Sequence, residues 1–258
     1  MHKIVLSTAL VSTLLFSGGD IVPVEAPVVE EVSAWEFEFS PYLAMSSISG
    51  DSAVISPDAL SHIELGFDDI VDALEFGVAG HFETLHSSNW GAFIDYNYVS
   101  LGGTGEIPLA PGVVLQEVDI KQSVFEAQGF YRQNFENGSF DYIAGIRYWN
   151  LKLNATLNQP DMHSTKNDWV DFVVGARWIH ALSENWKFYV SGDVGSGGSD
   201  FTASAVGGLR YTFNEWIDLD IQYKGLWVDY ETGTVNTLDY FKYDTVTYGP
   251  MIGLNFKF

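Results

Sequence analysis

From Trp35 to the last residue, apolar and polar side chains alternate with a period of two. This pattern is typical of β-strands with one apolar and one polar face, whereas an amphipathic helix repeats about every 3.6 residues. Gly, Asn, Asp and Ser separate the alternating runs, so the pattern predicts a series of strands joined by turns. The ten predicted strands are 35–46, 74–85, 89–101, 116–134, 139–153, 168–181, 185–195, 201–213, 215–229 and 245–258.

The predicted connections alternate in length along the chain. Outer-membrane barrels have short periplasmic turns and longer outer loops, so this rhythm predicts an all-β, transmembrane antiparallel up-and-down β-barrel. An even number of strands places both ends of the barrel on the periplasmic side. Residues 52–57 could also join an extra hairpin, which would make twelve strands. The short connections are 86–88, 135–138, 182–184 and 214, and the long ones are 47–72, 102–115, 154–167, 196–200 and 230–244.

The polar face of the predicted strands is strongly charged. In 139–153, for example, Tyr142 and Ile146 are assigned to the outer face, and Asp141 and Arg147 to the interior. A water-soluble barrel would have the opposite arrangement, because unpaired charges cannot form a dry core. We therefore expect ion pairs inside the barrel, with arginine and carboxylate in fork geometry. The predicted lumen network contains Glu36, Glu83, Asp95, Glu126, Asp141, Arg147, Asp171, Arg177 and Arg210.

Aromatic residues are frequent, with 8 Trp and 13 Tyr, and the Trp residues lie near the predicted strand ends. Amphipathic rings favour the two membrane interfaces. We predict one girdle at the short-turn end, formed by Trp35, Trp90, Trp178, Trp186 and Trp216, and a second at the long-loop end, formed by Trp149, Trp169 and Trp227. A last strand that ends in Phe256 and Phe258 is typical of the signal read by the outer-membrane assembly machinery.

The N-terminal residues have the features of an export signal. Lys3 provides a positive charge, and Ile4–Phe16 is an apolar stretch shorter than the ~20 residues of a transmembrane helix. Small side chains precede a cleavage point after Gly19, and cleavage after Ala26 is the alternative. Residues 20–34 would then form a periplasmic tail, and 35–258 the barrel.

The formal net charge of −22 disfavours nucleic acid as a partner, because phosphate recognition requires clustered Lys and Arg. The absence of Cys excludes thiol catalysis, disulfide bonds and Cys-ligated metal sites. We expect no cofactor and no metal ion. The expected partners are outer-membrane lipid and lipopolysaccharide, the assembly machinery and periplasmic chaperones, with the barrel itself a monomer.

The longest predicted loop contains a helical pattern at Phe67–Leu74, with apolar residues on one face and three aspartates on the other. Asp68 is predicted to cap the start of this helix. Two placements remain open, a plug over the barrel mouth and a surface helix that leads into the second strand. The aspartates lack the ordered spacing of a calcium-binding loop.

Nearly the whole chain after the export signal resembles an uncharacterised proteobacterial outer-membrane β-barrel family. Members begin with a W-x-F-x-x-x-P-Y-L strand and repeat a D-x-x-x-G-x-R strand, present here as Asp141/Gly145/Arg147 and Asp171/Gly175/Arg177. The resemblance implies the barrel fold and a Gram-negative outer-membrane location, and it implies no activity. The similar segments are WEFEFSPYLAMSSISGD (35–51), ELGFDDIVDALEFGVAGHFE (64–83), WGAFIDYNYVSL (90–101), VDFVVGARW (170–178) and YGPMIGLNFKF (248–258).

These features favour a structural or surface-interaction protein, or a narrow small-solute channel with a charged lumen. Ten strands are close to the eight-stranded barrels that side chains just fill, and far from porins of about 16–18 strands. The alternative is an outer-membrane hydrolase with a site at the extracellular rim, where Asp161 and His163 share a predicted loop. A single Asp-x-His is common by chance, so we do not expect an enzyme.

Overall fold

The computed structural model describes residues 33–54, 61–110, 113–157, 162–237 and 239–258. The predicted export signal and nearly all of the predicted tail at 20–34 lie outside the described residues. The compact unit Ala34–Phe258 consists almost entirely of antiparallel strands. Within the described ranges, no helix has the length and hydropathy needed to cross a membrane.

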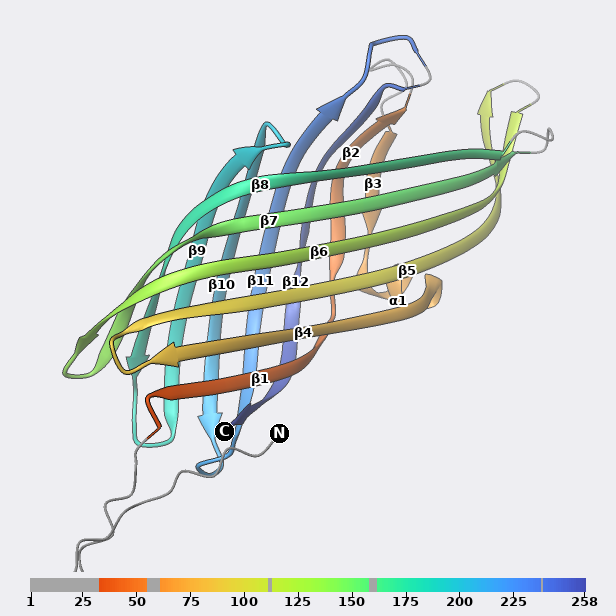
Figure 1. The fold of residues 1–258 in the computed structure, drawn as a ribbon. Helices are drawn as coiled ribbons and strands as arrows, with labels where there is room; N and C mark the ends of the chain where they lie inside the picture. Colours follow the sequence, from red (N-terminus) through yellow and green to blue (C-terminus); the bar gives the residue numbers. More distant parts are fainter. Residues whose placement is uncertain (1–32, 55–60, 111–112, 158–161, 238) are drawn as a thin grey trace, which may run out of the picture. The chain divides into compact units, whose positions relative to one another are not determined.

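Ten strands form a closed barrel wall, as predicted. Each strand pairs antiparallel with the next one in the wall, and β12 pairs with β1 to complete the circle. Figure 1 shows β4 (gold) to β12 (dark blue) following one another in chain order, with β1 (red) beside β4. The strands are β1 (Trp35–Ala44), β4 (Leu74–His86), β5 (Trp90–Ala110), β6 (Val113–Phe135), β7 (Gly138–Leu157), β8 (Met162–Ala181), β9 (Trp186–Gly197), β10 (Phe201–Thr212), β11 (Ile217–Thr232) and β12 (Phe241–Lys257).

Two further strands and a helix lie between β1 and β4. β2 (Ser47–Val54) continues β1 along the other half of β12, and β3 (Ser61–Leu65) pairs with β2. The extra hairpin considered from the sequence is therefore real. It extends the sheet to twelve strands while the closed wall keeps ten.

The predicted helix is present as α1 (Phe67–Ala73), and none of its residues is buried. It leads directly into β4, so the surface placement is confirmed rather than the plug. The capping role predicted for Asp68 is wrong. The backbone N–H of Gly66 donates to the carboxylate of Asp69 at 2.9 Å, because the side chain at the third helical position is the one that reaches back to the cap residue.

Two of the predicted long loops are extensions of β-hairpins. β5 and β6 remain paired as far as Ala110 and Val113, and β7 and β8 as far as Thr156 and Met162. Backbone N–H and C=O groups that leave the barrel wall can keep their hydrogen bonds by continuing the same ladder, even where the sequence is polar. The predicted long loop at 196–200 is likewise reduced to the three residues between β9 and β10.

Side chains along the wall alternate in the sense expected for a barrel in lipid. On β7, Asp141 and Arg147 have no exposed surface, whereas the outward Tyr142 is 53% exposed. On β11, the outward positions are apolar from Ile217 to Trp227 and change to Asp at position 229. Such an apolar stretch matches the ~9–11 residues that a tilted strand needs to cross the hydrocarbon of a membrane.

Candidate functional site

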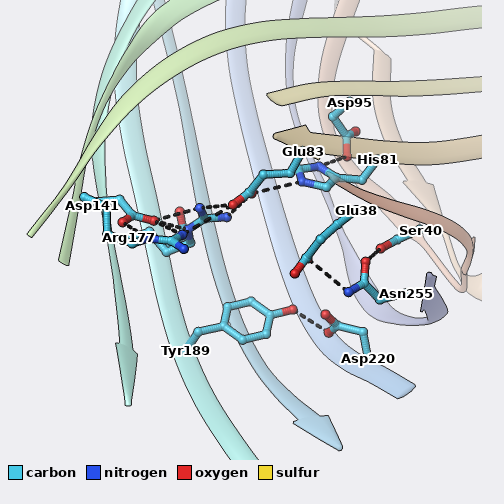
Figure 2. A network of polar contacts seen from close by, with 12 residues as sticks. Glu38, Ser40, His81, Glu83, Asp95, Asp141, Arg177, Tyr189, Asp220 and Asn255 are labelled. Atoms are coloured by element: carbon cyan, nitrogen blue, oxygen red, sulfur yellow. Dashed lines mark hydrogen bonds and ion pairs between the residues drawn. The ribbon is translucent and has the colours of Figure 1, made fainter. Parts of the chain in front are cut away.

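Among the described residues, three clusters of paired charges lie in the lumen, and the first joins two arginines to two carboxylates. Arg177 on β8 donates to both carboxylate oxygens of Glu83 on β4, at 2.7 and 2.8 Å, and to Asp141 on β7 at 2.8 Å. Arg132 on β6 forms a fork with Asp141 at 2.8 and 2.9 Å. Figure 2 shows Glu83 reaching toward Arg177, with Asp141 beyond it. These charge-assisted bonds offset the desolvation of Asp141, which is fully buried.

His81 on β4 connects this cluster to β5 and β1. Its ring nitrogens lie 3.4 Å from Glu83 and 3.3 Å from Asp95. Asp95 in turn accepts a hydrogen bond of 2.8 Å from the hydroxyl of Tyr42. The imidazole therefore lies between two carboxylates, as Figure 2 shows, and the polar contacts run without interruption from β1 to β8.

The second cluster surrounds Arg147 on β7, which has no exposed surface. Its guanidinium lies 2.9 Å from Asp193 on β9, donates to Thr202 at 3.0 Å, and lies 3.2 Å from Glu126 on β6. The ammonium of Lys224 on β11 contacts the other oxygen of Glu126 at 3.3 Å. Since β6 and β11 are five positions apart in the ten-stranded wall, this ion pair joins opposite sides of the lumen.

The third cluster lies at the seam where β12 meets β1. Arg210 on β10 contacts Glu38 on β1 at 2.8 Å and Asp220 on β11 at 2.9 Å. The buried Asn255 on β12 donates to Glu38 at 3.0 Å and accepts from Ser40 at 2.6 Å. Strand pairing and side-chain contacts therefore both hold the seam closed.

On the long-loop side of Arg147, the interior becomes apolar. Trp149 and Trp169 stack at 5.5 Å, and Trp169 stacks at 3.9 Å on Tyr230 from β11. These rings belong to what we call the lumen aromatic cluster, formed by Val124, Trp149, Leu151, Trp169, Leu226, Val228, Tyr230, Phe241 and Tyr243. The girdle position predicted for Trp149 and Trp169 is wrong, because both point inward, on the same strand faces as Arg147 and Asp171.

Two residues of the predicted lumen network do not join it. Glu36 is exposed at the start of β1 and makes no ion pair with the described residues. Asp171 is fully buried and accepts a hydrogen bond of 2.8 Å from the backbone N–H of Ser199, so it anchors the turn between β9 and β10. The clusters above contain the remaining members, namely Glu83, Asp95, Glu126, Asp141, Arg147, Arg177 and Arg210.

The other predicted girdle residues all lie on the exterior. Their exposed fractions range from 39% for Trp186 to 62% for Trp90, which contrasts with the near-complete burial of the two interior Trp residues. Phe256 and Phe258 are exposed as well, and the Phe258 ring stacks on Phe37 at 5.9 Å. The exterior Trp residues are Trp35, Trp90, Trp178, Trp186, Trp216 and Trp227.

The clusters also contain residues outside the predicted network, among them two residues of one strand. Asp193 binds Arg147, and Tyr189 donates to Asp220 at 2.6 Å, the contact visible in the lower part of Figure 2. Both lie on β9, in inward positions that alternate with the exposed Val190 and Val194. The same alternation that was applied to the neighbouring strands could have identified them.

The rim hydrolase considered from the sequence depends on Asp161 and His163. Asp161 and the side chain of His163 lie outside the described residues, so this hypothesis stays a prediction. Among the described side chains, no group of three or more His, Asp or Glu residues is arranged to hold a metal ion.

No family model and no curated protein sequence matches the chain. Among solved structures, the chain is similar to the outer membrane protease OmpT from Escherichia coli, with a TM-score of 0.54 and 9% identity over 88% of this chain and 99% of that one. It is also similar to the translocator domain of the autotransporter NalP from Neisseria meningitidis, with a TM-score of 0.51 and 10% identity over 90% and 91% of the two chains. At such low identity, the likeness shows the barrel fold alone.

Proposed function

We propose that this chain is an integral outer-membrane β-barrel protein with a closed lumen, whose role is structural or is carried by its outer surface. The membrane location is supported by the exterior, where large apolar side chains such as Phe172 (59%) and Tyr223 (53%) are widely exposed. A continuous apolar exterior around a charged interior is stable in lipid and unstable in water. The OmpT protease and the NalP translocator domain share this barrel fold.

The observation that carries the closed lumen is the contact of opposite walls at successive heights. Arg177 and Glu83 join β8 to β4, which are four positions apart in the wall, through hydrogen bonds of 2.7 and 2.8 Å. Nearer the long-loop side, Lys224 reaches Glu126 across five positions. A solute or hydrated ion would have to break these pairs, and each broken pair would leave a charge desolvated.

The lumen aromatic cluster adds an apolar layer beyond the ion pairs. Trp169 from β8 and Tyr230 from β11 stack with their planes only 10° apart. Tyr243 from β12 donates to Gln122 from β6 at 3.1 Å, so this layer also spans the lumen. A closed apolar layer repels ions because it offers no groups to replace their hydration.

Planar-bilayer recording of the refolded barrel tests this proposal. We expect no steady conductance after insertion, and insertion is verified in parallel by protease protection of the same protein in vesicles. Steady, cation-preferring steps would contradict the closed lumen and would instead support a narrow channel. A mature protein that stays folded and monomeric in buffer without detergent would contradict the membrane location itself.

A further inference from the structure

The outer face of the barrel contains an apolar groove over β9–β12, where large and small residues lie side by side. Its volume is about 660 Å³, which lies in the range of about 300–1,000 Å³ typical of small-molecule sites. Adjacent strands contribute to it side by side, since Gly207 on β10 lies opposite both Val190 on β9 and Tyr223 on β11. The lining residues are Val190, Ala205, Val206, Gly207, Tyr223, Gly225, Trp227, Val246 and Tyr248.

Two glycines produce the depth of the groove. At Gly207, a Cβ would meet no other atom within 4 Å, so this position is an open part of the floor. At Gly225, a Cβ would come within 2.7 Å of the Trp227 ring, so the missing side chain allows the indole to fold down against the strand. The groove is therefore a built depression with an aromatic wall, in a sheet whose neighbouring outward positions carry large side chains.

The chemistry of the lining identifies its occupant. None of the nine lining residues is charged, and the groove lies within the apolar stretch of β11 that ends at Trp227. Nine residues are also too few for a stable contact with a second copy, because specific protein interfaces use about 20–30 residues on each side. An uncharged, narrow and flexible ligand fits these limits.

We propose that this groove binds one acyl chain of a membrane lipid, an inference that rests on the membrane location proposed above. An acyl chain lying in the groove contacts protein atoms on several sides, whereas a chain against the convex wall has contacts on one side only. Each contact contributes little, but dispersion energy grows with their number. The rings of Tyr223, Trp227 and Tyr248 supply broad and rigid walls at low entropic cost.

Photo-crosslinking to lipid tests the proposal on the intact refolded barrel. The probe is phosphatidylcholine with a diazirine in its acyl chain, mixed into phosphatidylcholine vesicles, and the crosslinked peptides are mapped by mass spectrometry. We expect peptides from β10, β11 and β12 to be labelled several-fold more than the outward positions of β5–β7.

A matched pair of variants makes the test specific. Gly207→Leu fills the groove from an open position and should abolish the excess labelling. Gly129→Leu is the control, because Gly129 is exposed on β6 and its Cβ would meet only the Gly91 carbonyl oxygen, at 3.9 Å. If Gly207→Leu does not fold, Ala205→Leu replaces it, since Ala205 is also exposed and lines the groove.

The outcomes separate this inference from the proposed function. Equal labelling of all outward strand positions would overturn the acyl-chain proposal and leave the membrane location intact. Excess labelling that survives in folded Gly207→Leu or Ala205→Leu would do the same. Absence of labelling anywhere on a folded barrel would contradict the membrane location, and the acyl-chain proposal would fall with it.

Discussion

The ammonium of Lys224 lies 3.3 Å from the carboxylate of Glu126, although β11 and β6 occupy opposite sides of the barrel. Such a contact requires the lumen to be no wider than two extended side chains at this height. Glu126 also receives Arg147 at 3.2 Å and the amide of Gln128 at 2.7 Å, so its carboxylate is held from three directions. These contacts fill the lumen at this height and connect its opposite sides.

Removing the ammonium group of Lys224 should destabilise the barrel. Lys224→Met leaves Glu126 buried with Arg147 as its remaining ionic partner, and we expect the free energy of unfolding to fall by about 3 kcal/mol. Urea titration of the refolded barrel in detergent micelles measures the change. Lys166→Met on the exposed part of β8 is the control and should alter the unfolding midpoint little. Equal midpoints for the two variants would show that the cross-lumen pair contributes nothing.

The fork between Arg177 and Glu83 should not tolerate lysine. An ammonium cannot reproduce two parallel hydrogen bonds while also reaching Asp141, so Arg177→Lys should cost about 2 kcal/mol. The partner test is a double-mutant cycle with Glu83→Gln, measured by the same urea titration. The two substitutions should be non-additive by at least about 0.5 kcal/mol, and additive effects would mean that the contact is not energetically coupled.

A charge introduced at the seam should weaken barrel closure. Asn255 is fully buried and donates its amide hydrogens toward Glu38 and Asp218, at 3.0 and 3.4 Å. Asn255→Asp replaces this donor by a third carboxylate, and we expect a loss of about 2 kcal/mol. Asn255→Ser, which keeps a donor, should lose less, as judged by unfolding in urea. An Asp variant as stable as the native protein would contradict the role of the amide as a bridge between acids.

Truncating the lumen aromatic cluster should destabilise the barrel without opening it to ions. Trp169 is 5% exposed, and Trp169→Ala should lower stability by about 3–5 kcal/mol through the cavity it creates. Combined with Tyr230→Ala, it should still give no steady conductance in planar bilayers, because the Arg177–Glu83 and Lys224–Glu126 pairs continue to cross the lumen. Trp227→Ala, which removes an indole from the exterior, is the matched control and should lower stability less. Steady conductance of the inserted double variant would show that the ion pairs alone do not close the lumen.

Phe258 should matter more for assembly than for stability. Phe258 is 64% exposed, and its stacking on Phe37 is worth only about 0.5–1.5 kcal/mol. Phe258→Ala should therefore unfold at nearly the same urea concentration as the native barrel after refolding in detergent. In cells, we expect less folded protein in the outer membrane, quantified by fractionation. Unchanged assembly would argue against recognition of Phe258 by the assembly machinery.

Local pattern predicted most of the architecture. The ten wall strands follow from alternation with a period of two, and the assignment of Asp141 and Arg147 to the interior of β7 follows from the same alternation. The girdle assignment of Trp149 and Trp169 is wrong because it follows their position near the predicted strand ends and not the alternation. Trp149 lies two residues from the inward Arg147, and Trp169 lies two residues from the inward Asp171, so alternation places both rings inside. β7 and β8 also continue past them as a paired hairpin.

The identity of the partners inside the lumen was beyond local reasoning. In sequence, Arg177 follows Asp171 in the same strand, yet its fork is made with Glu83, which is 94 positions away along the chain. Asp171 holds a turn instead, through Ser199. Which charges meet depends on strand tilt, on the register of every pairing and on the diameter of the closed wall, and none of these is encoded within one strand.

The sequence alone thus determined the fold class, the order of the wall strands and the facing of most side chains, because each follows from interactions between near neighbours in the chain. Tertiary structure decided that the lumen is crossed by ion pairs and stacked rings, and that glycines on separate strands meet in one outer groove. The physical reason is that closing the sheet brings residues into contact whose only relation is their height in the wall and their angle around it.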